Sequence, residues 1–407
     1  MGRMPVCWKH ISNLLFGALV LLSGCLPAYT QAASSSPDDG KALDAATQAL
    51  CKAQVAMVGE IATHGDGHTL AFKVALVERL VDQCGFDAVF FEANQEEFIH
   101  LNQRLRSGDA VSSDDLLTAV GGIWKFYREF QPLAPFLLTR AQADRVVLGG
   151  LDDQLGQLGQ DYANIGMVIE LTDLLTEPKR HDCNMALHKR IFSAYSETAP
   201  YSEADRSQVE QCLEAMQAAS SADTIATALT KQGRQEMISA TQRWVSRDFM
   251  SAGESMANRD RSMFQTFEWL QSRLPSKHKT IVWAATVHIA KEGNPIWGDR
   301  EGTNLGSFIH RKYGSHARSL GFSAVAGSFR QGKGNFPKLP VAPADSVEAQ
   351  ALQGTGASAV YVGSKQLAAM GAHPGAFFNH SYQTLAWSTF LDGVVVFQTE
   401  RPPTDVR

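Results

Sequence analysis

The sequence predicts an α/β protein with a mainly parallel central sheet flanked by helices and a largely α-helical insertion. Short apolar runs alternate with segments of helical periodicity from about residue 43 onward. Such runs become scarce between about residues 160 and 275, where Ala, Gln, Glu, Leu and Met dominate, and then resume. With 407 residues, 44% of them hydrophobic, the chain can bury a large core. We therefore expect residues 43–159 and 276–407 to form the α/β core and 160–275 the helical insertion.

The N-terminal residues have the pattern of an export signal. Basic residues precede an apolar run at 14–22, which is too short to span a bilayer comfortably. The run ends in Leu-Ser-Gly-Cys, which closely resembles a bacterial lipobox. We expect a lipoprotein signal peptide over 1–24, a lipid anchor on Cys25 and a location on the periplasmic side of the cell envelope. An ordinary secretory signal, cut near Ala32, is the alternative.

The first part of the folded chain has the pattern of a βαβ unit. Residues 25–42, rich in Ser, Ala, Pro and Asp, predict a flexible tether before it. An apolar run at 55–59 predicts a strand, and another at 88–91 predicts a second. Between them a helix has apolar side chains at spacing four: Phe72, Leu76, Leu80 and Cys84. The two strands should be parallel and adjacent.

The remaining strands come from both sides of the insertion. Further apolar runs predict strands at 146–151, 280–286, 322–325, 360–363 and 394–398. Pro178 and Pro200 should break the helices of the insertion. The central sheet is thus expected to be assembled from both ends of the sequence.

The charge of the chain argues against a polyanionic partner. The formal net charge of −5 is spread along the chain without a basic run. Composition therefore gives nucleic acid no electrostatic attraction, and we expect a small-molecule substrate instead.

Four cysteines remain after Cys7 and Cys25 are assigned to the signal and the anchor: Cys51, Cys84, Cys183 and Cys212. An even number in an exported protein permits two disulfides, and pairs of neighbours in sequence are favoured. Four buried thiols are the alternative. A catalytic cysteine is disfavoured because none lies in a polar cluster.

Polar residues gather where the predicted strands end. Glu60 and His64 follow the first strand in VGEIATHGDGH (58–68), Glu92 ends the second, and His288 follows a later one. Loops at the carboxyl ends of parallel strands build the sites of open α/β sheets. Glu60 alone could cap a helix and His64 alone could be a core histidine. Two carboxylates and two imidazoles at one sheet edge favour a reactive site.

This residue set suits hydrolysis by activated water. A neutral imidazole can take a proton from water near neutral pH, so His64 is the expected general base. Glu60 or Glu92 would orient it, and His288 or Lys73 could stabilise an oxyanion. The alternative is that Glu60, His64, Glu92 and His288 bind a divalent metal such as zinc or manganese. No HExxH motif supports that alternative.

Other catalytic motifs are missing from the sequence. No GxSxG segment supplies a nucleophilic serine, and GDGH (65–68) lacks the Lys-Ser/Thr ending of a phosphate-binding loop. The segment HPGAFFNH (373–380) could form a loop over the pocket.

Five segments in order resemble the erythromycin esterase-like family. The family's Gly-Glu and Thr-His-Gly motif is matched by Gly59, Glu60, Thr63, His64 and Gly65. The other matches are KVALVERLVDQCGFDAVFFEAN (73–94), RDRSM (259–263), WAATVH (283–288) and the Leu-Gly…Gly-Phe…Gly-Ser-Phe pattern within 304–329. The resemblance covers roughly residues 55–330.

The resemblance implies an α/β fold with helical additions and a hydrolase of ester or lactone bonds, macrolides included. His64 would be the base, with Glu60, Glu92 and His288 in the pocket and Lys73 where a basic residue is usual. Arg259 and Asp260 would be structural or line the substrate site.

This chain departs from the family pattern in two places. Ile61 and Ala62 stand where one residue usually separates Glu from Thr-His, and Ala285 stands where many members have histidine. Two other functions therefore stay open: a metal-dependent hydrolase of another bond, and a non-catalytic envelope protein that binds a ligand.

Overall fold

The computed structural model describes residues 39–157, 159–293 and 302–406. The expected signal peptide, Cys25 and nearly all of the tether lie outside the described residues. Within the described ranges, no helix combines the length and the apolar character that crossing a membrane requires.

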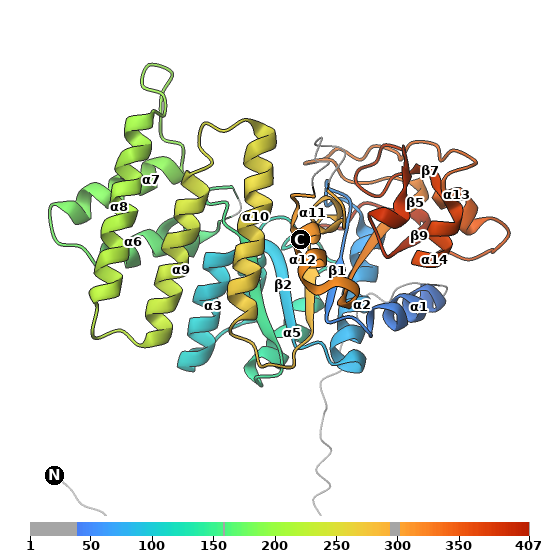
Figure 1. Cartoon of the computed structure of the whole chain (residues 1–407), viewed down its shortest axis with the longest axis horizontal. Coiled ribbons are helices and arrows are strands. Elements are labelled where there is room, and N and C mark those ends of the chain that lie inside the picture. The colour runs from blue at the N-terminus through green and yellow to red at the C-terminus, as the bar shows by residue number, and fades with distance from the viewer. Residues whose placement is uncertain (1–38, 158, 294–301, 407) are drawn as a thin grey trace, which may run out of the picture. The chain divides into compact units, whose positions relative to one another are not determined.

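A seven-stranded sheet forms the centre of the fold (Figure 1), with strand order β3-β2-β4-β1-β5-β9-β6. Neighbouring strands are parallel except β6, which pairs antiparallel with β9. The strands are β1 (Val55–Val58), β2 (Ala88–Asn94), β3 (Val147–Asp152), β4 (Thr280–Trp283), β5 (Ala317–Gly327), β6 (Ala359–Gly363) and β9 (Gly393–Glu400). The predicted fold class is confirmed, and both sides of the insertion contribute strands.

The expected adjacency of the first two strands is wrong, because β4 lies between β1 and β2. Thr280 pairs with Val55 on one side and with Ala88 on the other. A βαβ crossover fixes the parallel direction of its strands, but it leaves room for a later strand to insert between them. All four residues of β4 are buried, which fits a strand inside a parallel sheet that is covered on both faces. Because β4 lies between β1 and β2, the chain that follows β4 passes between the ends of these two strands.

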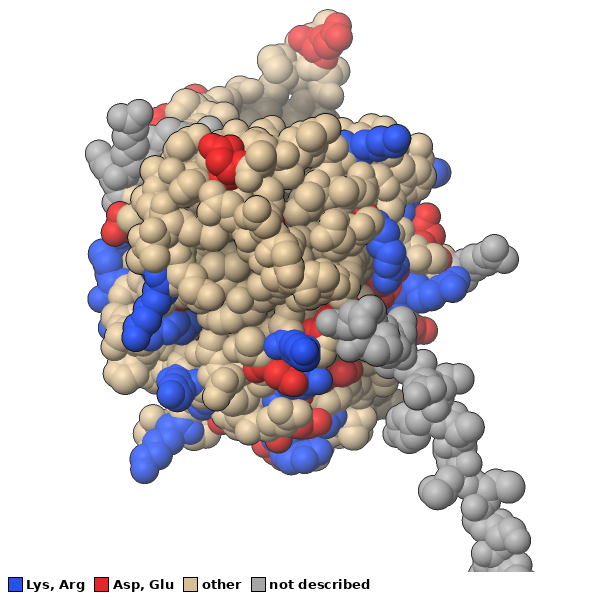
Figure 2. All heavy atoms as spheres, turned by 90° about the vertical axis from the view of Figure 1, so that its right-hand side faces the viewer, with Lys and Arg blue, Asp and Glu red and all other residues tan. Residues whose placement is uncertain are grey.

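A second sheet of two short strands was not predicted. β7 (Ala372–Gly375) pairs antiparallel with β8 (Gln383–Ala386). These four-residue strands contain Gly, Pro and Ala and show no clear apolar alternation, so no local pattern predicts them as strands. Figure 2 views the molecule from the side of this sheet and shows a broad area almost free of charged side chains.

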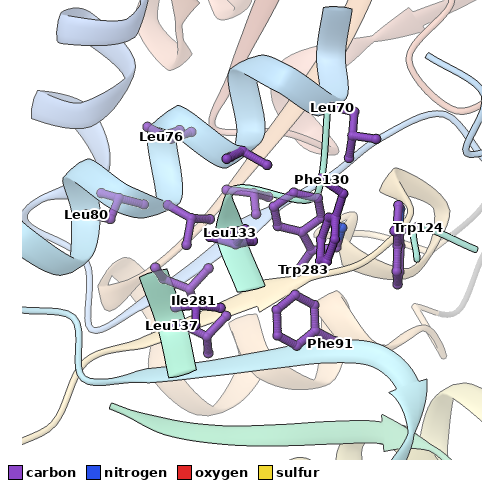
Figure 3. Close-up of a cluster of buried hydrophobic side chains, with 14 of the residues drawn as sticks. Leu70, Leu76, Leu80, Phe91, Trp124, Phe130, Leu133, Leu137, Ile281 and Trp283 are labelled. Atoms are coloured by element: carbon purple, nitrogen blue, oxygen red, sulfur yellow. The ribbon is translucent and has the colours of Figure 1, made fainter. Parts of the chain in front are cut away.

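Helices cover both faces of the large sheet. One face packs against α2, α4 and α5, with aromatic and aliphatic side chains between them (Figure 3). The other face packs against α10, α11, α12 and α13. Outside the insertion, the helices are α1 (Gly40–Leu50), α2 (Gly67–Cys84), α3 (Gln95–Ser107), α4 (Ser113–Val120), α5 (Leu133–Gln142), α11 (Thr286–Ile289), α12 (Leu305–Tyr313), α13 (Val347–Leu352) and α14 (Ser364–Met370), with single turns at Gly314–His316 and Trp387–Thr389.

The region between β3 and β4 is helical, as predicted. Its elements are the π-helical turn η2 (Tyr162–Gly166) and the helices α6 (Met167–Thr172), α7 (Lys179–Ile191), α8 (Glu203–Ala222), α9 (Ala228–Val245) and α10 (Ala252–Gln271). Pro178 directly precedes α7, and Pro200 lies between α7 and α8. Met263, Phe267 and Leu270 of α10 pack against the sheet. This last helix of the insertion therefore also forms part of the α/β core.

The four remaining cysteines form the two disulfides between sequence neighbours. Cys51 and Cys84 connect the ends of α1 and α2, with Cα atoms 5.0 Å apart. Cys183 and Cys212 connect α7 with α8, with Cα atoms 5.4 Å apart.

Removal of the insertion disulfide by Cys183→Ala with Cys212→Ala should lower the free energy of unfolding by about 3 kcal/mol, because the open loop regains chain entropy. Urea denaturation of the double variant and of the wild type measures the difference. An unchanged midpoint in oxidising buffer would contradict this expectation.

Candidate active site

The site begins where the backbone leaves β1 at Gly59. The N–H of Gly59 donates to the Leu320 carbonyl at 2.8 Å, and a Cβ atom at this position would lie 2.4 Å from Oγ1 of Thr286. The Thr286 N–H donates to the carbonyl of Glu60 at 2.7 Å. Only glycine fits between the neighbouring chain segments here, and the tight packing fixes the start of the loop that carries Glu60.

Glu60 and His64 form a hydrogen-bonded pair. Nδ1 of His64 lies 2.8 Å from Oε1 of Glu60, so the two residues between Glu60 and Thr63 do not prevent the contact. His64 has φ of 52°, a left-handed conformation that few non-glycine residues adopt. Its side chain is 16% exposed, while that of Glu60 is 4% exposed. Glu60 thus fixes the orientation of the imidazole, and part of the ring stays accessible to solvent.

Two further groups hold the Glu60 carboxylate. The indole N–H of Trp124 donates to Oε1 at 2.8 Å, and Nζ of Lys73 lies 3.1 Å from Oε2. Burial raises the pKa of Glu60, but Lys73 and His64 outweigh it and keep that pKa below its ordinary value. Burial lowers the pKa of Lys73 to about 8, opposed by Glu60 and Glu92.

A second carboxylate and imidazole pair lies at the ends of β2 and β4. Nδ1 of His288 lies 2.8 Å from Oδ1 of Asp260, and Nε2 lies 3.1 Å from Oε1 of Glu92. Burial lowers the pKa of His288, but the two carboxylates outweigh it and raise the pKa to about 10. Burial raises the pKa of Glu92, yet His288 and Arg259 hold it well below its usual range. His288 is therefore an imidazolium at neutral pH and Glu92 is a carboxylate.

Arg259 joins this pair to the edge strand β3. Its Nη2 donates to Oε1 of Glu92 at 3.0 Å, and its Nε donates to Oδ2 of Asp152 at 3.1 Å. Nη1 also lies 3.2 Å from Nε2 of His288. Since both groups carry protons when ionised, Glu92 rather than a direct hydrogen bond holds these two cations together.

The structure brings the four predicted residues to one edge of the sheet in two pairs, Glu60 with His64 and Glu92 with His288. Sequence reasoning missed Trp124 and Asp152. Asp152 could have been found, because it is an acid at the carboxyl end of a predicted strand, where Glu92 was found. Trp124 lies 64 positions from Glu60 in a segment with no strand or motif, so only the tertiary structure reveals its contact.

Lys73, Arg259 and Asp260 contact protein groups instead of lining an open surface. Their side chains are 0%, 8% and 2% exposed. A buried cation needs nearby carboxylates to offset its loss of hydration. Lys73 accordingly faces Glu60, and Arg259 lies between Glu92 and Asp152. The three residues therefore position Glu60, Glu92 and His288.

Ala285 supplies a backbone contact to the site. Its N–H donates to Oε2 of Glu92 at 2.8 Å, a bond that the backbone makes whatever side chain stands there. The segment after β7 also reaches the site, because Nε2 of His380 lies 3.3 Å from Oγ1 of Thr63 and 3.3 Å from Oδ1 of Asp66. The predicted loop 373–380 thus packs on the loop that carries His64.

The carboxylates do not fit the metal alternative. Lys73 already faces one oxygen of Glu60, and Arg259 faces one oxygen of Glu92. A divalent ion bound by both acids would lie close to these two buried cations. The repulsion between the positive charges is stronger in the protein interior than in water. Over residues 39–157, 159–293 and 302–406, no three His, Cys, Asp or Glu side chains are grouped to hold a metal ion.

The raised pKa of His288 predicts how stability depends on pH. The folded protein holds the proton of His288 up to about pH 10, whereas the unfolded chain releases it near 6.5. The resulting stabilisation is complete below pH 6.5 and is lost as pH rises toward 10. Urea denaturation from pH 7 to 10 should show falling stability in the wild type and a shallower fall in His288→Gln. Parallel curves would contradict this.

Three comparisons with known proteins bear on the family and the fold of this chain. The erythromycin esterase family model matches residues 81–391, so Glu60 and His64 precede the matched region. A protein of Bacillus subtilis (strain 168), "Putative hydrolase YbfO", is 20% identical over 352 residues, which are 79% of this chain and 76% of that protein.

Solved structures share the fold. A Bacillus cereus protein superposes with a TM-score of 0.68 at 15% identity, over 90% of this chain and 93% of that one. A succinoglycan biosynthesis protein gives 0.67 at 16% identity, over 89% and 91%. A mutant erythromycin esterase, EreC, in its open conformation gives 0.61 at 12% identity, over 89% and 94%. Since the family model spans most of the chain, this protein belongs to the erythromycin esterase family.

Proposed function

We propose that this protein is an exported hydrolase that cleaves an ester or lactone bond with water activated by His64. The observation that carries the proposal is the Glu60 and His64 pair, in which a buried carboxylate holds Nδ1 of a part-exposed imidazole. The bond to Nδ1 fixes the tautomer, so that Nε2 has the lone pair that accepts a proton.

The proposed reaction needs one base and one electrophile. Nε2 of His64 takes a proton from water as the water oxygen attacks the carbonyl carbon of the ester. Glu60 stabilises the imidazolium that forms, and Lys73 with Trp124 keeps Glu60 ionised and in place. The tetrahedral intermediate then collapses, the C–O bond to the alcohol breaks, and His64 returns the proton to the leaving oxygen.

The second pair, Glu92 with His288, belongs to a cluster of buried charges beside the first. His288 and Arg259 carry two positive charges next to Glu92, and Asp152 and Asp260 hold them from the other side. Two cations and three carboxylates neutralise one another almost completely, so the cluster is rigid and carries little net charge. We propose that this cluster holds the ends of β2 and β4 in place beside the base while His64 moves the proton.

A substrate panel tests the proposed reaction. Purified protein starting near Ser36 is incubated with macrolides, simple lactones and p-nitrophenyl esters, with and without a chelator. We expect turnover of at least one ester or lactone that the chelator does not reduce. Turnover lost with the chelator and restored by zinc or manganese would favour the metal alternative. No turnover of any ester or lactone would favour a ligand-binding protein.

We also propose that the protein reaches the cell envelope and is anchored there through Cys25. The lipobox-like sequence and two disulfides between sequence neighbours support this proposal. In a bacterial host, the wild type should fractionate with membranes, whereas Cys25→Ser should not be lipidated. Detection of the unmodified wild type in the cytoplasm would contradict the proposal.

A further inference from the structure

A narrow cavity lies among α3, α9, α10 and the edge strand β3, and it is separate from the residues of the candidate active site. Its volume is about 60 Å³, enough for a few water molecules or a short chain of atoms. The cavity follows one face of α3, whose lining side chains are Gln95, Phe98, Ile99, Asn102, Gln103 and Arg106. These positions span 11 steps of helix, or about 16 Å. We call this cavity the α3 slot.

The inner end of the α3 slot holds an amide without a partner. Gln95 is 1% exposed, and among the described residues neither its Nε2 nor its Oε1 has a hydrogen-bond partner. Nε2 of Gln103, which lies further along α3 toward Arg106, is likewise buried and has no hydrogen-bond partner among the described residues. Buried amides normally find a partner in protein, water or ligand, since desolvation costs free energy. A molecule in the slot would supply those hydrogen bonds.

The other end of the α3 slot is positively charged. Arg106 and Arg273 are both exposed there, and within the described residues neither has a carboxylate at ion-pair distance. The Arg273 guanidinium stacks 3.8 Å above the Trp269 ring. Burial lowers the pKa of Arg273, the Glu236 carboxylate opposes this shift, and nearby Arg106 adds to it. Nη1 of Arg273 already donates to the Trp269 carbonyl at 2.8 Å and to Oγ of Ser272 at 3.2 Å, and Nη2 donates to Oε1 of Gln232 at 3.4 Å. A carboxylate attracted by the two guanidinium groups would therefore meet Arg273 through Nε and Nη2.

Apolar side chains join the two ends. Phe98 and Ile99 of α3 face Trp269 and Leu270 of α10, and Phe98 is 1% exposed. Along α3 the slot therefore offers the Gln95 amide, then the apolar Phe98 and Ile99, then the amides of Asn102 and Gln103, and last the Arg106 guanidinium with Arg273 near it. We propose that the α3 slot binds a short, unbranched hydroxycarboxylate, with its carboxylate at Arg106 and Arg273 and its hydroxyl at Gln95.

Calorimetric titration of the whole protein with 6-hydroxyhexanoate tests the proposal. We expect saturable binding that weakens at least tenfold in Arg106→Gln with Arg273→Gln. Arg128→Gln is the matched control, because Arg128 is also exposed and has no carboxylate at ion-pair distance within the described chain. Gln95→Leu should fold at least as well as the wild type, since it removes an unpaired amide. This variant should bind hexanoate and 6-hydroxyhexanoate equally, whereas the wild type should prefer the hydroxy acid.

A hydroxycarboxylate is also the product that a lactone hydrolase releases, so binding at the active site must be distinguished. His64→Ala should keep the full heat of binding if the α3 slot is the site. Loss of binding in His64→Ala but not in the arginine double variant would overturn the proposal, as would no binding to the wild type. These outcomes are independent of whether the protein hydrolyses esters.

Discussion

His64→Ala is expected to lower kcat/KM for any ester or lactone that the protein hydrolyses by about 10³-fold, within the range of a lost general base. The alanine removes the group whose Nδ1 lies 2.8 Å from Glu60 and whose other nitrogen would receive the proton of water. The effect should fall on kcat more than on KM, because proton transfer belongs to the transition state. Initial rates over a substrate series measure both constants.

Two comparisons make the His64 experiment specific. His181→Ala is the matched control, since His181 is an exposed histidine on α7 and should leave the rates unchanged. Glu60→Gln keeps a side chain of the same shape and should lower kcat, because a neutral amide stabilises the imidazolium poorly. If His64→Ala turned over every substrate at the wild-type rate, the proposed role of His64 would be refuted.

Arg259→Met is expected to lower the free energy of unfolding by about 3 to 5 kcal/mol, since removing one member of a buried ion pair leaves the others uncompensated. Arg259 contacts both Asp152 and Glu92, and its side chain is 8% exposed. The variant would leave Asp152 and Glu92 buried without this cation, and of the two only Glu92 would keep a contact with His288. Urea denaturation followed by circular dichroism at neutral pH gives the difference.

The same motif provides the control for Arg259. Arg261→Met alters an exposed arginine two positions away, which donates to Oδ1 of Asn258 on the same helix. It should change the free energy of unfolding by less than about 0.5 kcal/mol. In an Asp152→Asn background, Arg259→Met should lower the free energy of unfolding by less than in the wild type. One of the carboxylates that Arg259 neutralises is then already removed. Equal costs in both backgrounds would show that the ion pair is not the source of the effect.

The strands and the helical region were predictable because burial leaves a local pattern. β1 is apolar throughout, β2 is apolar over 88–91, and β4 is apolar except at Thr280. α2 repeats apolar residues every four positions, so short sequence windows reveal both kinds of element. The order of the strands was not predictable in the same way. The adjacency expected for β1 and β2 failed because both strands pair with β4, in which Thr280 faces Val55 and Ala88. These partners are far apart in the sequence, and no local pattern predicts such a pairing.

The sequence by itself determined the α/β class, the helical region between β3 and β4, and the identity of Glu60, His64, Glu92 and His288 as polar residues at strand ends. Only the tertiary structure decided how they pair, because hydrogen bonds and ion pairs join residues brought together by strand order. The tertiary structure also decided that Lys73 is buried against Glu60 and Arg259 against Glu92. Whether a cation is buried depends on residues from many separate segments of the chain.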